Sequence, residues 1–212
     1  MTLAITHVHN LPPHFSYVSP LPDITQKPKS YAVFLLIGKA ASVFQRLRPI
    51  WTSCVVSIAT KIWLYNSIVV SVASYASETW KMTARIEHKL NVFHQRCLRK
   101  ILKVAYKDHI TNEKILLWAN SRKLSDIVTE RRFRMVGHIL RLPDHQAAKV
   151  AISWTPADGR RKTGRPKKTW HRTFQQDLQM VDFKWEEVEC VATDRSKWRQ
   201  AAARCAQRHG RN

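Results

Sequence analysis

Positive charge constrains this chain more than any other feature, because its fold must accommodate 36 Lys and Arg side chains against only 15 Asp and Glu. The formal net charge is 36 − 15 = +21 over 212 residues. Such an excess opposes compaction unless the cations lie at the surface, where they attract anionic partners. Residues 1–80 carry 6 − 2 = +4 and residues 81–212 carry 30 − 13 = +17. We therefore expect an anion-binding surface in the last two thirds of the chain.

Glycine is scarce, with 5 residues, whereas apolar residues make up 44% of the chain and include 8 Trp. The lack of glycine argues against Gly-rich phosphate loops and turn-rich β-sandwiches, and the apolar content is enough for a packed core. The fold class predicted is mainly α. Because Cys54, Cys97, Cys190 and Cys205 form no C-x-x-C pair, we expect no disulfide framework and no ribbon-type zinc site.

The chain begins with a proline-rich segment that has no helical period, and residues 1–35 are predicted to be a disordered or irregular arm. Its first 26 residues contain no Lys or Arg, so they lack the charged start of a signal peptide and the arginines of a transit peptide. We expect a nuclear or cytoplasmic protein that is not secreted.

Residues 54–76 are apolar enough to raise the question of a membrane span. Lys61 is the only charged residue in this segment, and a lysine inside a span would oppose insertion by up to about 2.5–3.5 kcal/mol. A buried helix of a soluble domain is the preferred interpretation, with the run from Ile68 to Val72 either continuing it or forming a short extended piece. A membrane anchor is kept as an alternative.

The pattern from Ala84 to Lys103 predicts an amphipathic helix with Thr83 as its N-cap. Ile86, Leu90 and Cys97 belong to an apolar side that faces the core. A second side is basic, and the helix has a single acidic residue, Glu87, to pair with it. The candidate nucleic-acid contacts on this side are Arg85, Lys89, Arg96, Lys100 and Lys103.

A second amphipathic helix is predicted from Asp126 to Leu142, with Ser125 as a candidate cap and Pro143 ending it. Its candidate nucleic-acid contacts are Arg131, Arg134 and Arg141, on a side that also includes His138. Arg132 falls among the apolar positions, so we expect it either to be paired or to contact another element.

The most basic stretch is GRRKTGRPKKTWHR, residues 159–172, which contains no acid. Such a segment suits a phosphate backbone, although a nuclear-localisation signal or a solvated loop has the same composition. The candidate contacts here are Arg160, Arg161, Lys162, Arg165, Lys167 and Lys168. After them, Trp170, Phe174 and Leu178 predict an inward-packing helix, followed by two short helices around 184–191 and 194–207.

Catalytic chemistry is not predicted anywhere in the chain. There is no Y-x-D-D or comparable acidic pair for a two-metal polymerase, and Ser, His and Asp form no triad signature. His94 and Cys97, with His109 or His138, have spacings that match no zinc pattern, so a packed cysteine and a polar-edge histidine are preferred. We expect no catalytic residue, no metal, no cofactor and no small-molecule substrate.

Seven strings along the chain resemble, in order and spacing, the C-terminal part of the reverse transcriptases of non-LTR, LINE-type retrotransposons that carry an apurinic-type endonuclease. The resemblance covers roughly residues 36–208. The strings are IGKAASVFQRLRPIW (37–51), TKIWLYNSIVVSVASYASETW (60–80), FHQRCLRKIL (93–102), DHITNEKIL (108–116), LSDIVTERRFRMVGHILRLPD (124–144), GRRKTGRPKKTW (159–170) and DRSKWR (194–199).

The resemblance implies a thumb-like helical domain over 36–105, which in the family grips the template-primer duplex. It also implies a basic helical C-terminal domain over 106–212 that helps to hold RNA and DNA. The family's endonuclease and its palm with metal-binding aspartates have no counterpart here, and Tyr75-Ala76 stands where the family has Tyr-Gly. The expected function is RNA or DNA binding through phosphate contacts without catalysis. The alternatives are a translated relic with no selected ligand and a small basic protein anchored in a membrane by residues 54–76.

Overall fold

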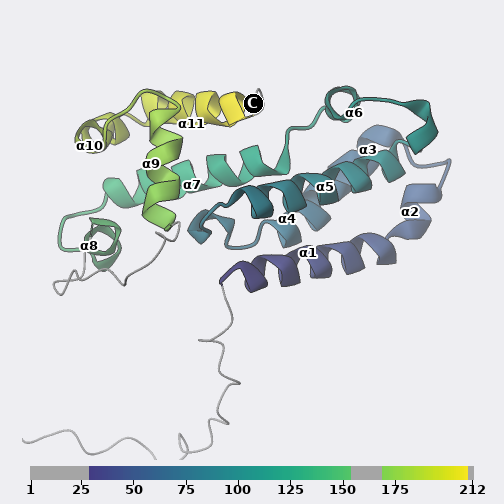
Figure 1. The fold of residues 1–212 in the computed structure, drawn as a ribbon, viewed down its shortest axis with the longest axis horizontal. Helices are drawn as coiled ribbons and strands as arrows, with labels where there is room; N and C mark the ends of the chain where they lie inside the picture. The colour runs from purple at the N-terminus through teal and green to yellow at the C-terminus, as the bar shows by residue number, and fades with distance from the viewer. Residues whose placement is uncertain (1–28, 154–168, 210–212) are drawn as a thin grey trace, which may run out of the picture.

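The computed structural model describes residues 29–153 and 169–209, and these are helical with no strand among them. The predicted mainly α class is confirmed. Figure 1 shows two groups of helices joined by the long helix α7 (Leu124–Leu140). The first group contains α1 (Lys29–Arg46), α2 (Arg48–Thr52), α3 (Ile58–Leu64), α4 (Ser71–Ala73), α5 (Ala84–Ile101) and α6 (Asn112–Trp118). The second contains α8 (Ala147–Ser153), α9 (Trp170–Gln179), α10 (Trp185–Thr193) and α11 (Arg195–His209).

Each group has its own hydrophobic cluster. We call the helices around the cluster from Val33 to Val128 the N-terminal unit, and those around the cluster from Phe133 to Cys205 the C-terminal unit. The two clusters meet inside α7, further along the chain than the domain boundary predicted at 105/106. Helix α1 begins at Lys29, so residues 29–35 are helical, although the sequence assigned them to the arm. Val33 explains the difference, since it is buried in the core and ties the start of the helix down.

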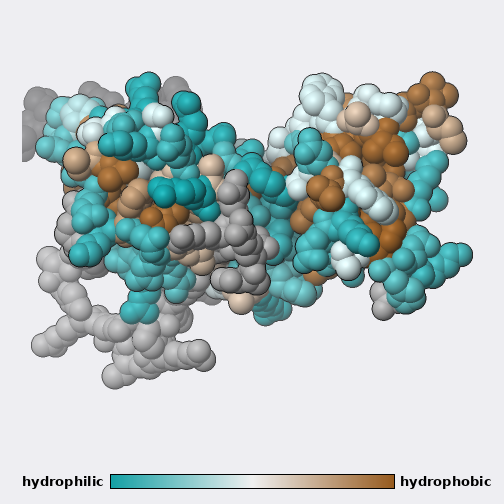
Figure 2. All heavy atoms as spheres, turned by 90° about the horizontal axis from the view of Figure 1, so that it is seen from above, coloured by the Kyte–Doolittle hydropathy of each residue, from teal (hydrophilic) through white to brown (hydrophobic). Residues whose placement is uncertain are grey.

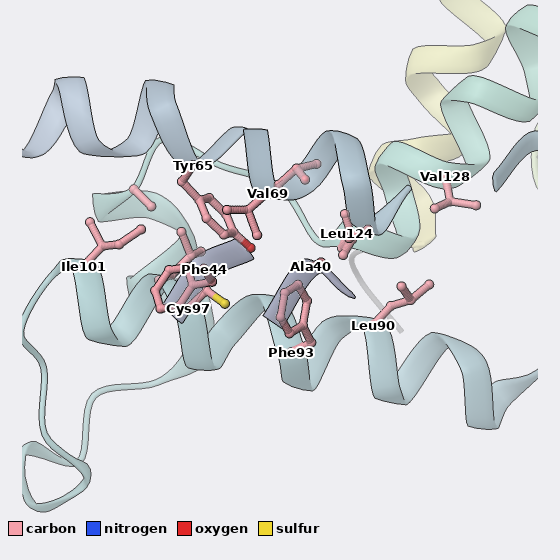
Figure 3. Packing of buried hydrophobic residues seen from close by; sticks show 14 of the residues in the cluster. Ala40, Phe44, Tyr65, Val69, Leu90, Phe93, Cys97, Ile101, Leu124 and Val128 are labelled. Carbon is pink, nitrogen blue, oxygen red and sulfur yellow. The ribbon is translucent and has the colours of Figure 1, made fainter. Parts of the chain in front are cut away.

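The N-terminal core is built from α1, α5 and the start of α7, packed around the chain segment between α3 and α4 (Figure 3). Phe44 stacks on Trp51, with ring centroids 5.1 Å apart, and the Trp51 indole donates to the Phe44 carbonyl at 2.8 Å. These contacts fold α2 back against the end of α1. The core therefore fixes one side of α5 and leaves the other side exposed.

Residues 58–73 form one continuous helical segment, because a π-helical turn, η2 (Tyr65–Val70), joins α3 to α4. The run from Ile68 to Val72 thus continues the helix. Lys61 is buried, and its ammonium donates to the carbonyls of Trp51 and Ser53 at 3.1 and 2.6 Å. These bonds stabilise the end of α2. No helix among the described residues is both long enough and apolar enough to cross a membrane, and this includes the helices within residues 54–76.

A chain of polar contacts crosses the N-terminal core. The Tyr65 hydroxyl and His94 Nδ1 are 2.8 Å apart, and His94 Nε2 lies 3.3 Å from the Ser121 hydroxyl. Burial lowers the pKa of His94 to about 4 and raises the pKa of the neighbouring Cys97 thiol to about 12. His94 is therefore neutral at physiological pH, with both ring nitrogens engaged by hydroxyl groups.

The C-terminal unit packs α11 along α7 at a point of very close approach. The indole of Trp198 lies over Gly137 and donates to the Phe133 carbonyl at 2.8 Å. A Cβ at position 137 would lie 2.1 Å from Trp198 Nε1, so this crossing requires glycine. The inward-packing helix predicted after Pro166 is α9, with Phe174 and Leu178 buried, and the two short helices predicted after it are α10 and α11.

Candidate nucleic-acid interface

Helix α5 forms as the sequence predicted at its start and stops earlier at its end. The Thr83 hydroxyl caps it by accepting a hydrogen bond from the Ile86 amide at 3.3 Å. The last helical residue is Ile101, and Lys103 takes a left-handed conformation with φ 57°. The five predicted contacts therefore share one side of the helix except for Lys103, which lies just beyond its end.

All five of these cations are exposed, and we call Arg85, Lys89, Arg96, Lys100 and Lys103 the α5 ridge. At 1.5 Å per residue the helical part of the ridge, from Arg85 to Lys100, extends over about 22 Å. Glu87, the only acidic residue in α5, projects about 140–180° away from the ridge residues on a helical wheel. No carboxylate of α5 itself therefore neutralises the ridge.

Two α5 arginines, Arg85 and Arg99, contact neighbouring parts of the fold. The Arg85 guanidinium lies over the ring of Phe34 in α1, 5.5 Å from its centroid. Arg99 donates to the Ile110 carbonyl at 2.6 Å and to the Asn112 side chain at 3.1 Å, which docks the start of α6 on α5. Arg99 therefore serves the fold, while the ridge residues beside it point to solvent.

Helix α7 starts two residues earlier than the predicted second amphipathic helix, and Ser125 is not its cap. It begins at Leu124, and its N-cap residue, Lys123, makes no side-chain cap. Ser125 is buried inside the first turn, where its hydroxyl accepts from Asn91 and donates to Asp126, both at 3.2 Å. The Ser125 side chain thus faces a neighbouring helix, which is why it does not cap its own.

The three cations predicted on α7 make contacts within the protein. Arg131 donates to the Ser74 carbonyl at 3.0 Å, and Arg141 donates to the Ala192 carbonyl at 2.9 Å. Arg134 pairs with Glu130, which also pairs with Arg122 at 2.7 Å. The structure therefore does not bring these arginines together as a free basic surface, in contrast to the α5 ridge.

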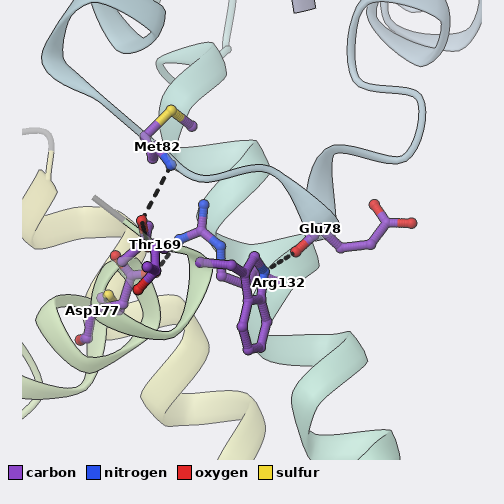
Figure 4. A network of polar contacts seen from close by, with 8 residues as sticks. Glu78, Met82, Arg132, Thr169 and Asp177 are labelled. Atoms are coloured by element: carbon purple, nitrogen blue, oxygen red, sulfur yellow. Dashed lines mark hydrogen bonds and ion pairs between the residues drawn. The ribbon is translucent and has the colours of Figure 1, made fainter. Parts of the chain in front are cut away.

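Arg132 is fully buried and pairs with Asp177 of α9, as expected for a cation among apolar positions (Figure 4). Close to this pair the Met82 amide donates to the Thr173 hydroxyl at 3.2 Å, and the Trp170 indole donates to the Glu78 carbonyl at 2.7 Å. Together these contacts dock α9 against the chain that leads into α5. They link the two units.

The basic stretch from Arg160 to Lys168 lies outside the described residues, as does Pro166. The chain after it is described from Thr169, whose hydroxyl accepts from the Arg172 amide at 3.2 Å and caps α9. Trp170 stacks on Phe174 and is anchored to Glu78, so it serves packing. The first described residues after the gap therefore lie near the chain that leads into α5.

The other side chains considered from the sequence do not form a metal site. His94 and Cys97 face the core from α5, and both nitrogens of His94 lie within hydrogen-bond distance of hydroxyl groups. His109 and His138 belong to other parts of the chain. In the parts of the chain that the structure describes, no group of three or more His, Cys, Asp or Glu residues could hold a metal ion.

Apolar side chains are exposed at one end of the molecule. Val55, Ile58 and Leu117 are 96, 53 and 77% exposed. Seen from above, apolar residues gather at the end where α2, α3 and α6 lie (Figure 2). Such side chains offer nothing to phosphate groups, so this end of the molecule is not part of the candidate interface.

A cavity of about 440 Å³ lies where α5, α7 and α9 meet, and no sequence pattern had predicted it. Its walls come from segments that are far apart in the chain, which explains why no local motif marks it. The residues that line it are Met82, Glu87, Ser125, Thr129, Thr173, Gln176, Asp177, Gln179 and Met180.

Comparison with known proteins found one informative similarity. Over 145 residues the chain is 21% identical to an uncharacterized transposon-derived protein of Caenorhabditis elegans. The match covers 65% of this chain and 52% of that protein, so the chain spans about half the length of the relative it matches. No protein-family model and no solved structure matches. The similarity indicates a transposon-related origin.

Proposed function

We propose that this chain binds RNA or DNA through phosphate contacts, as a fragment of a non-LTR retrotransposon reverse transcriptase that corresponds to the thumb and the region after it. Binding would proceed without catalysis, because the acidic metal ligands of the palm have no counterpart in the sequence. The observation that carries the proposal is the α5 ridge, a line of exposed cations with no carboxylate of its own helix beside it. The transposon-derived relative supports the origin.

The ridge has the dimensions of a phosphate-binding surface. Successive phosphates of one strand in a duplex are about 3.4 Å apart along the helix axis, so a helical ridge of about 22 Å extends past several of them. Lysine and arginine bound to phosphates release counter-ions, which gives affinity without base readout. Phe34 holds Arg85 at one end of the ridge, so part of the surface is ordered before binding.

The basic stretch 160–168 belongs to the same proposed surface. Trp170, two residues after this stretch, is fastened to Glu78, and Thr173 is fastened to Met82, two residues before the start of α5. Trp170 and Thr173 therefore lie on the side of the molecule where the ridge begins with Arg85. One nucleic acid could then contact both the ridge and the basic stretch.

The test is a fluorescence-anisotropy titration of the whole chain with a labelled RNA hairpin and a matched DNA duplex over a series of salt concentrations. We expect a log-log salt slope steeper than about −4, which corresponds to roughly five released counter-ions. The triple variant Lys89→Glu, Arg96→Glu, Lys100→Glu should weaken binding at least tenfold and reduce the slope by about three. Reversing charges within 160–168 should weaken binding to all sequences alike.

A matched control separates a defined surface from net charge alone. Lys39→Glu, Arg46→Glu, Arg48→Glu changes the net charge equally at exposed positions of α1 and α2. Lys39 and Arg46 lie about 120–140° around α1 from Phe34, the residue beneath the ridge. Equal losses for the two triple variants would show that charge acts without a site, as expected for a relic with no selected ligand.

A further inference from the structure

The cavity between α5, α7 and α9 has the chemistry of a hydrogen-bonding site. Seven of its nine lining residues are polar, and the walls offer two carboxylates, three hydroxyls and two side-chain amides. Ser125, Thr129, Thr173 and Asp177 are each at most 3% exposed. A volume of about 440 Å³ falls within the range of small-ligand sites. The cavity therefore combines a suitable size with fixed polar groups.

Several of these polar groups are satisfied within the protein, and others are not. Ser125 bonds Asn91, Thr173 bonds Met82, and Asp177 pairs with Arg132. Thr129, in contrast, is 2% exposed and lines the cavity, and its hydroxyl makes no hydrogen bond to another described residue. The Thr129 hydroxyl is not among the buried side-chain atoms that lack a partner, so it is open to the cavity and available to a polar occupant.

A buried group without a full set of partners lies behind the cavity wall. Arg132 is fully buried, and its Nε and one terminal nitrogen have no partner among the described residues. Figure 4 shows its guanidinium directed at Asp177, which lines the cavity. This cation balances Asp177 and leaves the Glu87 carboxylate as the uncompensated charge of the site.

The charges determine which class of molecule the cavity can hold. A phosphate would meet the uncompensated carboxylate of Glu87, so it is excluded. Carboxylates instead accept hydrogen bonds from N–H groups, as they do from the amino group of cytosine. Adenine, cytosine and guanine carry an exocyclic amino group, whereas uracil and thymine present carbonyl oxygens there. The Met82 and Met180 side chains offer polarizable surfaces to a flat ring.

We infer that the cavity receives one unpaired nucleobase with an exocyclic amino group, from the nucleic acid whose phosphates lie on the α5 ridge. This inference rests on the proposed function. Glu87 is two residues from both Arg85 and Lys89, so the cavity and the first cations of the ridge occupy opposite sides of the same helical turns. A single-stranded end that passes the start of α5 would place its base in the cavity and its phosphates on the ridge. Unpaired bases are recognised through their Watson–Crick edges in this way.

The test compares short RNA duplexes that share one stem and differ in a single-stranded overhang of adenines, cytosines, uracils or abasic sites. Fluorescence anisotropy with the whole chain should give affinities about tenfold higher for adenine or cytosine overhangs than for abasic ones, with uracil in between. Thr129→Val removes the hydroxyl at nearly constant shape and should reduce the preference about threefold or more. Glu87→Gln should reduce the preference for amino-bearing bases over uracil, because an amide can also donate to a carbonyl.

Controls keep the two proposals separable. Glu113→Gln removes a carboxylate from the exposed surface of α6 and should leave the preference among overhangs unchanged. Equal affinities for all four overhangs would overturn the inference. Tight, salt-dependent binding in the same experiment would still support the proposed function. Loss of all binding in the wild type would refute the proposed function itself. A preference that survives both Thr129→Val and Glu87→Gln would place base recognition elsewhere and would also overturn the inference.

Discussion

The ridge on α5 in the N-terminal unit and the arginines of α7 at its junction with the C-terminal unit use the same kind of residue in opposite ways. The N-terminal core fixes one side of α5, and the ridge cations on the other side are left exposed. In the C-terminal unit and at its junction with the first, Arg131, Arg132 and Arg141 bond to distant parts of the chain. The comparison teaches that a basic stripe on a helix indicates a binding surface only where the fold leaves its cations unpaired.

The Arg132–Asp177 pair gives the strongest way to break this comparison. Asp177→Ala would leave a buried cation without its partner, so we expect the free energy of unfolding to fall by about 3–5 kcal/mol. Chemical denaturation followed by circular dichroism measures the change. Glu130→Ala, which removes the partner of the exposed Arg122 and Arg134, should lower it by only about 1 kcal/mol or less.

A double variant sharpens the same point. Arg132→Met combined with Asp177→Leu replaces both charges by apolar groups, and it should recover most of the stability lost by Asp177→Ala. If the double variant is as unstable as the single one, the pair contributes more than charge compensation to the junction.

His94 tests the polar contacts of the N-terminal core. The pKa of His94 is lowered from 6.5 to about 4 in the folded protein, so between these pH values the unfolded chain takes up a proton that the folded chain does not. The free energy of unfolding should therefore fall as the pH falls from 6.5 to 4, by up to about 3 kcal/mol from this group. Denaturation over this pH range should show a smaller dependence in His94→Gln. An unchanged dependence would contradict a neutral, buried His94.

Two glycine substitutions compare the packing of the units directly. Gly137→Ala forces a methyl group into the Trp198 indole and should lower the free energy of unfolding by about 2–3 kcal/mol. Gly38→Ala in α1 meets nothing within 4 Å and should raise it by about 0.5–1 kcal/mol, since alanine is the better helix former. Hydrogen exchange should locate the loss for Gly137→Ala in α7 and α11. A loss spread evenly over both units would show that they unfold as one.

The smallest expected effects separate structural arginines from binding ones. Arg131→Met and Arg141→Met each remove a charged donor from a backbone carbonyl, and each should lower the free energy of unfolding by about 1–2 kcal/mol. Their effect on nucleic-acid affinity should be weaker than that of Lys89→Met and Arg96→Met on the ridge, which should leave stability within about 0.5 kcal/mol of the wild type. The two pairs are compared by denaturation and anisotropy. The reverse pattern would move the proposed interface to α7.

The sequence by itself determined the helical class, the Thr83 cap, and the basic and apolar sides of α5, because these depend on residues within a few positions of each other. It also marked Arg132 as a residue in need of a partner. Only the tertiary structure decided which cations are free, since the groups that bind Arg131, Arg132 and Arg141 lie 57, 45 and 51 residues away. The cavity likewise exists only where α5, α7 and α9 meet. Helical periodicity shows which side a residue occupies, but a distant partner is fixed only when the helices pack.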